Sequence, residues 1–189
     1  DANLLVAEGL LLTLNNILKI RESDDGRQMV LKPLELRSWL ASYAEKPPRG
    51  MAKKRMTLTV ELYEHEAWAL ANEEKLLEAL DNLMSNAVKF GREATPIILT
   101  LKTEKGQARI SVKDEGPGVA PELLPHLFEK LFAANRGPTR QYPGLGLGLA
   151  LAQNIMKLHN GHVWLESKGS GLGSTAHISL PLARKESKE

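Results

Sequence analysis

Apolar and polar residues separate onto two faces of one predicted helix around the stretch Glu78–Glu93 (EALDNLMSNAVKFGRE). At about 100° per residue, one face collects apolar side chains and the opposite face collects polar ones. The apolar positions are Leu76, Leu77, Leu80, Leu83, Met84, Ala87 and Val88. The polar positions are Lys75, Glu78, Asn82, Ser85, Asn86, Lys89 and Glu93. This pattern predicts an amphipathic helix.

Helical spacing of apolar residues marks three further segments. Leucines three and four residues apart predict a helix over residues 2–20. Its apolar stripe needs a partner outside this chain, a second copy of it, or both. Pro33 suits the first turn of another helix, which runs to about Tyr43, and a long helix is predicted from about Leu147 to His159.

Alternating runs and short β-rich runs bounded by turn residues predict strands. The candidate strands are residues 27–32, 56–63, 96–103, 107–113, 162–167 and 174–180. The third and fourth of them form an antiparallel hairpin across Glu104-Lys105-Gly106. A mixed, mostly antiparallel sheet with helices on one face gives an α/β (α+β) two-layer sandwich.

The composition narrows the function classes. The chain has 189 residues and 42% hydrophobic content, which suits one globular domain with a sizeable core. A net charge of +2 provides no global field for nucleic acid, so a nucleic-acid partner is not expected. The charged run Arg49–Arg55 (RGMAKKR) is interpreted as a solvated loop.

The sequence also bears on localisation. It contains no cysteine, so it has neither disulfides nor thiolate metal sites, and a cytoplasmic setting fits. Its apolar runs are too short to cross a bilayer. Because the first residue is Asp1 rather than Met, we expect a piece of a longer protein, with membrane association only through segments missing here.

Two asparagines, Asn82 and Asn86, stand one turn apart at the centre of the polar helix face. Asparagine is a poor helix former, so its use there needs a reason. An amide oxygen is a hard, neutral ligand suited to Mg²⁺, and Lys89 on the same face could meet a phosphate. The alternative is a plain surface helix with scattered polar residues.

Asp114-Glu115-Gly116-Pro117-Gly118 directly follows a predicted strand. These residue types favour a turn, which is one interpretation. The other is that the Asp114 carboxylate accepts a hydrogen bond from the exocyclic amine of adenine, while Gly116 and Gly118 let the backbone approach a flat ring. Such a site should prefer ATP to GTP.

Glycines alternate with leucines from Gly144 to Ala150 (GLGLGLA), directly before the long predicted helix. Glycine-rich backbone at a helix N-terminus is suited to anions. The preceding segment, 129–143, lacks periodicity and is interpreted as a lid, with Phe128 at its base. Arg136 and Arg140 could meet phosphate when this lid closes, or they are simply solvated.

In the order of these motifs, the chain resembles the catalytic, ATP-binding domain of bacterial sensor histidine kinases, within the GHKL (Bergerat-fold) ATPase superfamily. The resemblance runs from about Leu31 to Leu182. The matching motifs are Asn82–Phe90 (N box), Asp114–Gly118 (first G box), Leu127–Phe132 (F box), Gly144–Ala150 (second G box) and Gly173-Ser174-Thr175.

This resemblance implies a Bergerat fold that binds ATP and Mg²⁺. It implies that Asn86 ligates the metal, that Asn82 and Lys89 contact phosphates as catalytic residues, and that Asp114 reads adenine. Phe90 stands where the family often has an aromatic over the nucleotide, and Thr175 would support Asp114 directly or through water. The predicted nucleotide site is completed by Gly116, Gly118, Phe128, Arg136, Arg140, Gly144, Gly146, Leu147 and Gly148.

The resemblance also implies a domain organisation. Residues 1–26 are similar to the second helix of a dimerisation hairpin, residues 27–183 form the catalytic domain, and residues 184–189 form a charged tail. A homodimer through the hairpin and a response-regulator receiver domain are the implied partners. The first hairpin helix, with its phosphoacceptor histidine, is missing, so this fragment should bind nucleotide without phosphorylating itself. The pair His65-Glu66 is rejected as that site because it follows a strand inside the domain.

Two positions bear on activity. The hydrolysing relatives, such as gyrase-like and chaperone ATPases, have a glutamate at the position of Asn82, and an amide cannot act as that general base. We expect Glu78, one turn earlier, to be solvated. Ala133 stands where family members often carry an arginine, so Arg136 or Arg140 substitutes or transfer is slow. The alternatives are a nucleotide-binding pseudokinase or phosphatase-biased regulator, and an anti-sigma-type serine kinase.

Overall fold

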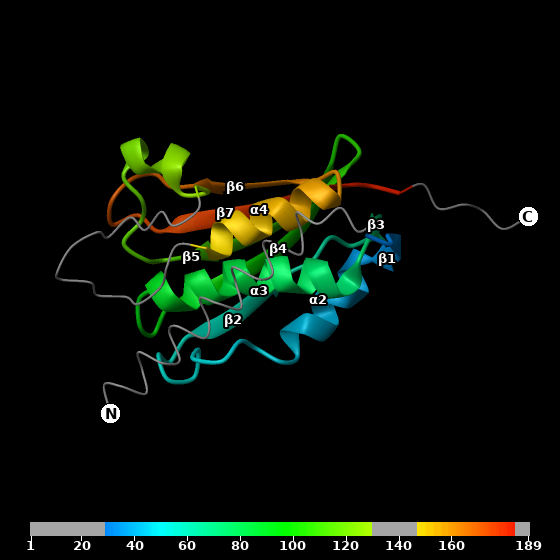
Figure 1. The fold of residues 1–189 in the computed structure, drawn as a ribbon. Helices are drawn as coiled ribbons and strands as arrows, with labels where there is room; N and C mark the ends of the chain where they lie inside the picture. Colours follow the sequence, from blue (N-terminus) through cyan, green and yellow to red (C-terminus); the bar gives the residue numbers. More distant parts are fainter. Residues whose placement is uncertain (1–28, 130–146, 184–189) are drawn as a thin grey trace, which may run out of the picture.

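The structure, a computed structural model, describes residues 29–129 and 147–183 (Figure 1). Its centre is a five-stranded sheet in the order β2–β4–β5–β7–β6. The strands are β2 (Thr57–Glu61), β4 (Pro96–Glu104), β5 (Gln107–Asp114), β7 (Ser174–Pro181) and β6 (His162–Glu166). β2 pairs with β4 in parallel, and the other neighbouring pairs are antiparallel. The prediction of a mixed, mostly antiparallel sheet is confirmed.

Two long helices, α3 (Glu73–Phe90) and α4 (Gly148–Leu158), cover one face of this sheet, side by side and in opposite directions (Figure 1). α3 begins after Asn72, whose side-chain oxygen accepts a hydrogen bond from the Lys75 N–H at 3.0 Å. Such an N-cap satisfies a helix donor that would otherwise lack a partner. Apart from Leu77, which is 37% exposed, the apolar stripe predicted on α3 is buried, and it shares one core with α4 and the sheet. The two-layer sandwich is thereby confirmed.

The beginning of the described chain differs from the prediction. Pro33 lies in a strand, β1 (Lys32–Glu35), rather than at the start of a helix. β1 pairs antiparallel with β3 (Trp68–Ala71) to form a separate two-stranded sheet. An edge strand tolerates proline because that position need not donate to a ladder. The four residues of β3 are too few to show an alternating pattern, so β3 was not predicted.

Helix α2 (Leu36–Ala44) begins three residues after Pro33. The Glu35 carboxylate caps it by accepting from the Arg37 N–H at 3.1 Å and the Ser38 N–H at 2.7 Å. A carboxylate at this place also interacts favourably with the helix dipole. The cap, and not the proline, therefore sets where this helix starts.

The helix predicted at residues 2–20 and the tail at 184–189 lie outside the described residues. Within the two ranges that the structure describes, no helix combines the length and the apolar character needed to span a bilayer.

Candidate functional site

Asp114 is the last residue of β5, and its side chain is only 6% exposed. One carboxylate oxygen accepts from the Gly116 N–H at 2.7 Å, and the other accepts from the Ser174 hydroxyl at 2.5 Å. Burial raises the pKa of the Asp114 carboxyl above its ordinary value of 3.8, and the hydrogen bonds from Ser174 and Gly116 oppose this only partly. A carboxylate offers about four lone-pair sites, so each oxygen can still accept from a ligand.

The hydroxyl in direct contact with Asp114 is not the one expected. The structure places the Ser174 hydroxyl, not that of Thr175, in direct contact with Asp114. Asp114 and Ser174 are cross-strand partners of β5 and β7, whereas Thr175 stands opposite Lys113. Because neighbouring residues of a strand point to opposite faces, only one of the two hydroxyls can share the face of Asp114. Both hydroxyls can be identified from the sequence, but the register between β5 and β7 cannot.

The two glycines after Asp114 stand where a side chain would not fit. A Cβ on Gly116 would lie 2.6 Å from the Asp114 carboxylate and 2.7 Å from the Phe90 carbonyl oxygen. Gly118 has a φ of +68°, and its Cβ would collide with the carbonyl of Gly169. These contacts explain the glycines at both positions, and they bring the end of α3 against the loop after Asp114.

A second loop, between β6 and β7, closes over the first. The Gly171 N–H donates to the Pro117 carbonyl at 2.5 Å, and the Gly173 N–H donates to the Gly116 carbonyl at 3.2 Å. The Arg92 guanidinium, just after α3, donates to the Gly171 carbonyl at 3.0 Å. Backbone bonds of this kind hold the Asp114 loop in one conformation.

The polar face of α3 meets the first residues of α4. The Asn82 amide nitrogen donates to the Glu78 carbonyl at 2.8 Å, which turns its oxygen toward Gly148. A Cβ on Gly148 would lie 2.8 Å from that oxygen. Asn82 therefore lies against the N-terminus of a helix, where an anion is favoured.

The other predicted residues of α3 lie further along the same helix. Asn86, Lys89 and Phe90 are each half-buried near its C-terminal end. The Lys89 ammonium lies 4.9 Å from the centre of the Phe90 ring. Mg²⁺ takes one or two protein oxygens and completes its shell with water and phosphate, so the Asn86 amide fits its ligand chemistry. Among the described residues, no cluster of three or more His, Cys, Asp or Glu side chains could hold a metal.

Of the glycine segment before α4, the structure describes Leu147 and Gly148. Leu147 is buried, at 4% exposure, directly before the first turn of α4. Phe128 is half-buried, close after the short helix η1 (Pro121–His126). The predicted residues Arg136, Arg140, Gly144 and Gly146 lie outside the described residues.

Glu78 differs from expectation. Its side chain is 15% exposed rather than solvated, and it pairs with the Lys75 ammonium at 3.1 Å. Glu78, the acidic residue one turn before Asn82, is therefore already paired with Lys75.

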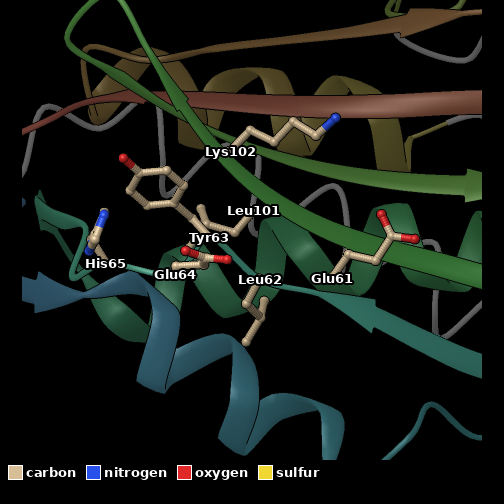
Figure 2. Close-up of a pocket in the computed structure, with 7 residues that line it drawn as sticks. All are labelled: Glu61, Leu62, Tyr63, Glu64, His65, Leu101 and Lys102. Carbon is tan, nitrogen blue, oxygen red and sulfur yellow. The ribbon is translucent and has the colours of Figure 1, made fainter.

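A shallow pocket of about 340 Å³ lies away from this site (Figure 2). Tyr63 and His65 at its edge meet edge to face, with ring centres 5.4 Å apart. Its lining, which consists of residues 61–65, Leu101 and Lys102, includes neither Asp114 nor a residue of α3. The pocket is thus distinct from the residues predicted to bind nucleotide.

Sequence comparison places the chain among known ATPases. Residues 71–184, more than half of the chain, match the family described as "Histidine kinase-, DNA gyrase B-, and HSP90-like ATPase". A methyl sulfide methyltransferase-associated sensor of Methanosarcina acetivorans is 39% identical over 108 residues, which cover 57% of this chain and 11% of that protein. The sensor histidine kinase RppB of Synechocystis sp. is 37% identical over 125 residues, which cover 66% of this chain and 27% of RppB. The chain thus spans only a small part of these relatives.

Solved structures show the same fold. Full-length ShkA in complex with AMPPNP has a TM-score of 0.81 and 28% identity, covering 96% of this chain and 38% of ShkA. Histidine kinase ThkA in complex with the response regulator protein TrrA has a TM-score of 0.77 and 19% identity, covering 97% of this chain and 51% of that chain. At the latter identity the likeness concerns the fold alone. The chain therefore belongs to the family of histidine kinase-, DNA gyrase B- and HSP90-like ATPases, as an ATP-binding domain of the sensor histidine kinase type.

Proposed function

We propose that this domain binds Mg-ATP and presents its γ-phosphate to a histidine on a dimerisation hairpin. The observation that carries the proposal is the buried Asp114 carboxylate, fixed by Gly116 and Ser174 at the end of β5. A carboxylate so placed accepts from the exocyclic amine of adenine, whereas guanine presents a carbonyl oxygen at the same position. The complex of ShkA with AMPPNP supports an adenine nucleotide as the ligand.

The polar end of α3 would hold the phosphates. Asn82 lies against the N-terminus of α4, where backbone N–H groups and the helix dipole favour negative charge. Lys89 would neutralise phosphate charge, and the Asn86 amide oxygen would ligate Mg²⁺. The metal, when bound, supplies charge neutralisation between neighbouring phosphates.

Phosphoryl transfer depends mostly on positioning and charge neutralisation. A nitrogen of the acceptor histidine would form a bond to the γ-phosphorus, while the bond from that phosphorus to the β,γ-bridging oxygen breaks and ADP leaves. The phosphoryl group would then pass to an aspartate of a receiver domain. Asn82 favours transfer over hydrolysis because a neutral amide cannot activate water as a general base.

The partners follow from the same proposal. Residues 1–26 would pair with a second copy in a homodimer through the hairpin, and the response-regulator receiver domain would be the final acceptor. The complex of ThkA with TrrA shows a relative of this fold bound to a response regulator. The leucine stripe in residues 2–20 supports a helical partner for this segment.

Calorimetric titration with ATP, in the presence and absence of Mg²⁺, tests the binding step. We expect Asn86→Ala to lose the Mg²⁺-dependent part of the affinity, and the exposed neighbour Ser85→Ala to bind as wild type. Equal Mg²⁺ dependence in the two variants would contradict the metal assignment.

The transfer step is tested on a protein that also includes a dimerisation hairpin with its acceptor histidine. Incubated with ATP, it should form an acid-labile phosphohistidine. Nucleotide binding without any phosphohistidine would instead indicate a regulator, and stable phosphoserine on a partner would indicate a serine kinase.

A further inference from the structure

Lys54 makes a contact that its place in a charged run does not suggest. Its ammonium donates to the carbonyl of Lys89 at 2.7 Å and to the carbonyl of Gly91 at 3.1 Å. One carbonyl belongs to the last turn of α3 and the other to its C-cap residue, Gly91, and neither accepts a hydrogen bond within the helix. A lysine at this end also interacts favourably with the helix dipole. Part of the run Arg49–Arg55 is therefore a helix cap and not a solvated loop.

The turn that carries Lys54 is held in place. The Lys54 N–H lies 3.1 Å from the Met51 carbonyl, and the Lys54 carbonyl accepts from the Ala94 N–H at 2.9 Å. Met51 and Met56 on either side are buried, at 3% and 7% exposure. A Cβ on Gly91 would lie 2.6 Å from the end of Met56, so the turn packs closely on the residue after α3. The backbone that carries the Lys54 side chain is therefore held in place.

The end of α3 lies between the turn that carries Lys54 and the loop after Asp114. On one side Lys54 holds the carbonyl of Lys89. On the other, the Phe90 carbonyl lies so near Gly116 that a Cβ there would be 2.7 Å away. The two residues fixed in this way, Lys89 and Phe90, are those proposed to meet the phosphates and the nucleotide. A shift in this turn of the helix would move both side chains.

We propose that Lys54 is a positioning residue, which fixes the last turn of α3 and so sets where Lys89 meets the phosphates of the nucleotide. The inference rests on the proposed function for its ligand, but its geometry is independent of any ligand. Lys54 itself would not touch the nucleotide. Its charge acts through the two carbonyls, so arginine at this position should retain the effect.

The test compares Lys54→Met with Lys54→Arg in the whole 189-residue chain. Lys54→Met should weaken Mg-ATP binding about tenfold, because a displaced Lys89 would lose most of one charge-assisted hydrogen bond to the phosphates. Lys54→Arg should bind within about twofold of wild type, as should the matched control Lys53→Met at an exposed neighbouring position. In a Lys89→Ala background, Lys54→Met should add little further loss, because the two residues act as a unit.

A purely structural role would lower the melting temperature of Lys54→Met while leaving ATP affinity unchanged in the folded protein, or would be additive with Lys89→Ala. Either result would overturn the inference. Backbone amide NMR shifts without nucleotide provide a separate readout: Lys54→Met should move the amides of residues 89–91 and leave those of 76–80 in place. If wild type binds no ATP, the proposed function fails, and these shifts still decide whether Lys54 positions the helix end.

Discussion

The two ends of the central sheet differ in how they hold buried polar groups. At the end where α3 begins, His159 is 2% exposed and both ring nitrogens are bonded. Nδ1 lies 2.8 Å from the Ile155 carbonyl, and Nε2 accepts from the Asn72 N–H at 3.0 Å. At the other end, the Asp114 carboxylate is buried, and burial raises its pKa. At the first end, the histidine end, both ring nitrogens are bonded within the protein. At the other, the charged end, each carboxylate oxygen still has a lone pair that can accept from a ligand.

The tautomer of the His159 ring follows from its partners. A carbonyl can only accept and a backbone N–H can only donate, so Nδ1 carries the proton and Nε2 does not. This ring joins the last residue before α3 to the residue after α4. The packing of α3 on α4 is therefore secured far from the proposed nucleotide site, where no group needs to remain available to a ligand.

The largest expected effect is on ligand binding at the charged end. Asp114→Asn should lower ATP affinity about 100-fold, because the acceptor for the adenine amine is replaced by a group that can present a donor. The melting temperature of the nucleotide-free domain should not fall, because the variant removes a buried charge. Calorimetry and thermal unfolding on the same samples check both. If Asp114→Asn were less stable than wild type and still bound ATP, Asp114 would serve stability rather than ligand binding.

At the histidine end, the expected effect is on stability. His159→Phe leaves the Asn72 N–H and the Ile155 carbonyl without the side-chain partner, so the free energy of unfolding should fall by about 1–3 kcal/mol. ATP affinity of the folded variant should remain near that of wild type. His162→Phe, at an exposed position on β6, is the matched control and should change stability little. Urea unfolding of the three proteins gives the answer, and equal midpoints would exclude a special role for His159.

A smaller effect is expected at the hydroxyl beside Asp114. Ser174→Ala should weaken ATP binding about fivefold, since one hydrogen bond that orients the carboxylate is lost. Thr175→Ala should have less effect because Thr175 stands opposite Lys113 rather than Asp114. Affinities of the two alanine variants, measured side by side, decide between the neighbouring hydroxyls. A larger loss in Thr175→Ala would favour the residue expected from the sequence.

The smallest effect concerns pH. The raised pKa of Asp114 means that the folded domain binds this proton more tightly than the unfolded chain does. Ionised Asp114 therefore costs stability above its folded pKa, and the cost disappears as the pH falls through that pKa toward 3.8. The stability advantage of Asp114→Asn over wild type should accordingly shrink with acidification. Denaturant unfolding of both proteins across this pH range would measure the difference in their stability. A difference that grows as the pH falls would contradict the prediction.

Much of this arrangement can be predicted from the sequence. The 3.6-residue pattern found α3 and α4, and the alternating pattern found all five strands of the main sheet to within a few residues. The positions of Asn82, Asn86 and Lys89 on one helix face followed from the same periodicity. Asp114 was found because a carboxylate before two glycines stands at a strand end. These are local signals, and helix and strand geometry are enough to interpret them.

What the sequence could not provide depends on tertiary contacts. The choice between Ser174 and Thr175 needs the register of β5 with β7. The cap by Lys54 joins residues 35 apart, and no local pattern marks it. β3 is short, and it is a strand because it pairs with β1. In each case a partner distant in sequence decides the role of a residue.

The most direct test of the central claim is the titration of the wild-type chain with ATP and with GTP. If the buried Asp114 carboxylate reads the exocyclic amine, ATP should bind and GTP should bind at least about tenfold more weakly, because guanine would place a carbonyl oxygen against the carboxylate. Equal affinity for the two nucleotides, or a preference for ATP that persists in Asp114→Asn, would contradict the account.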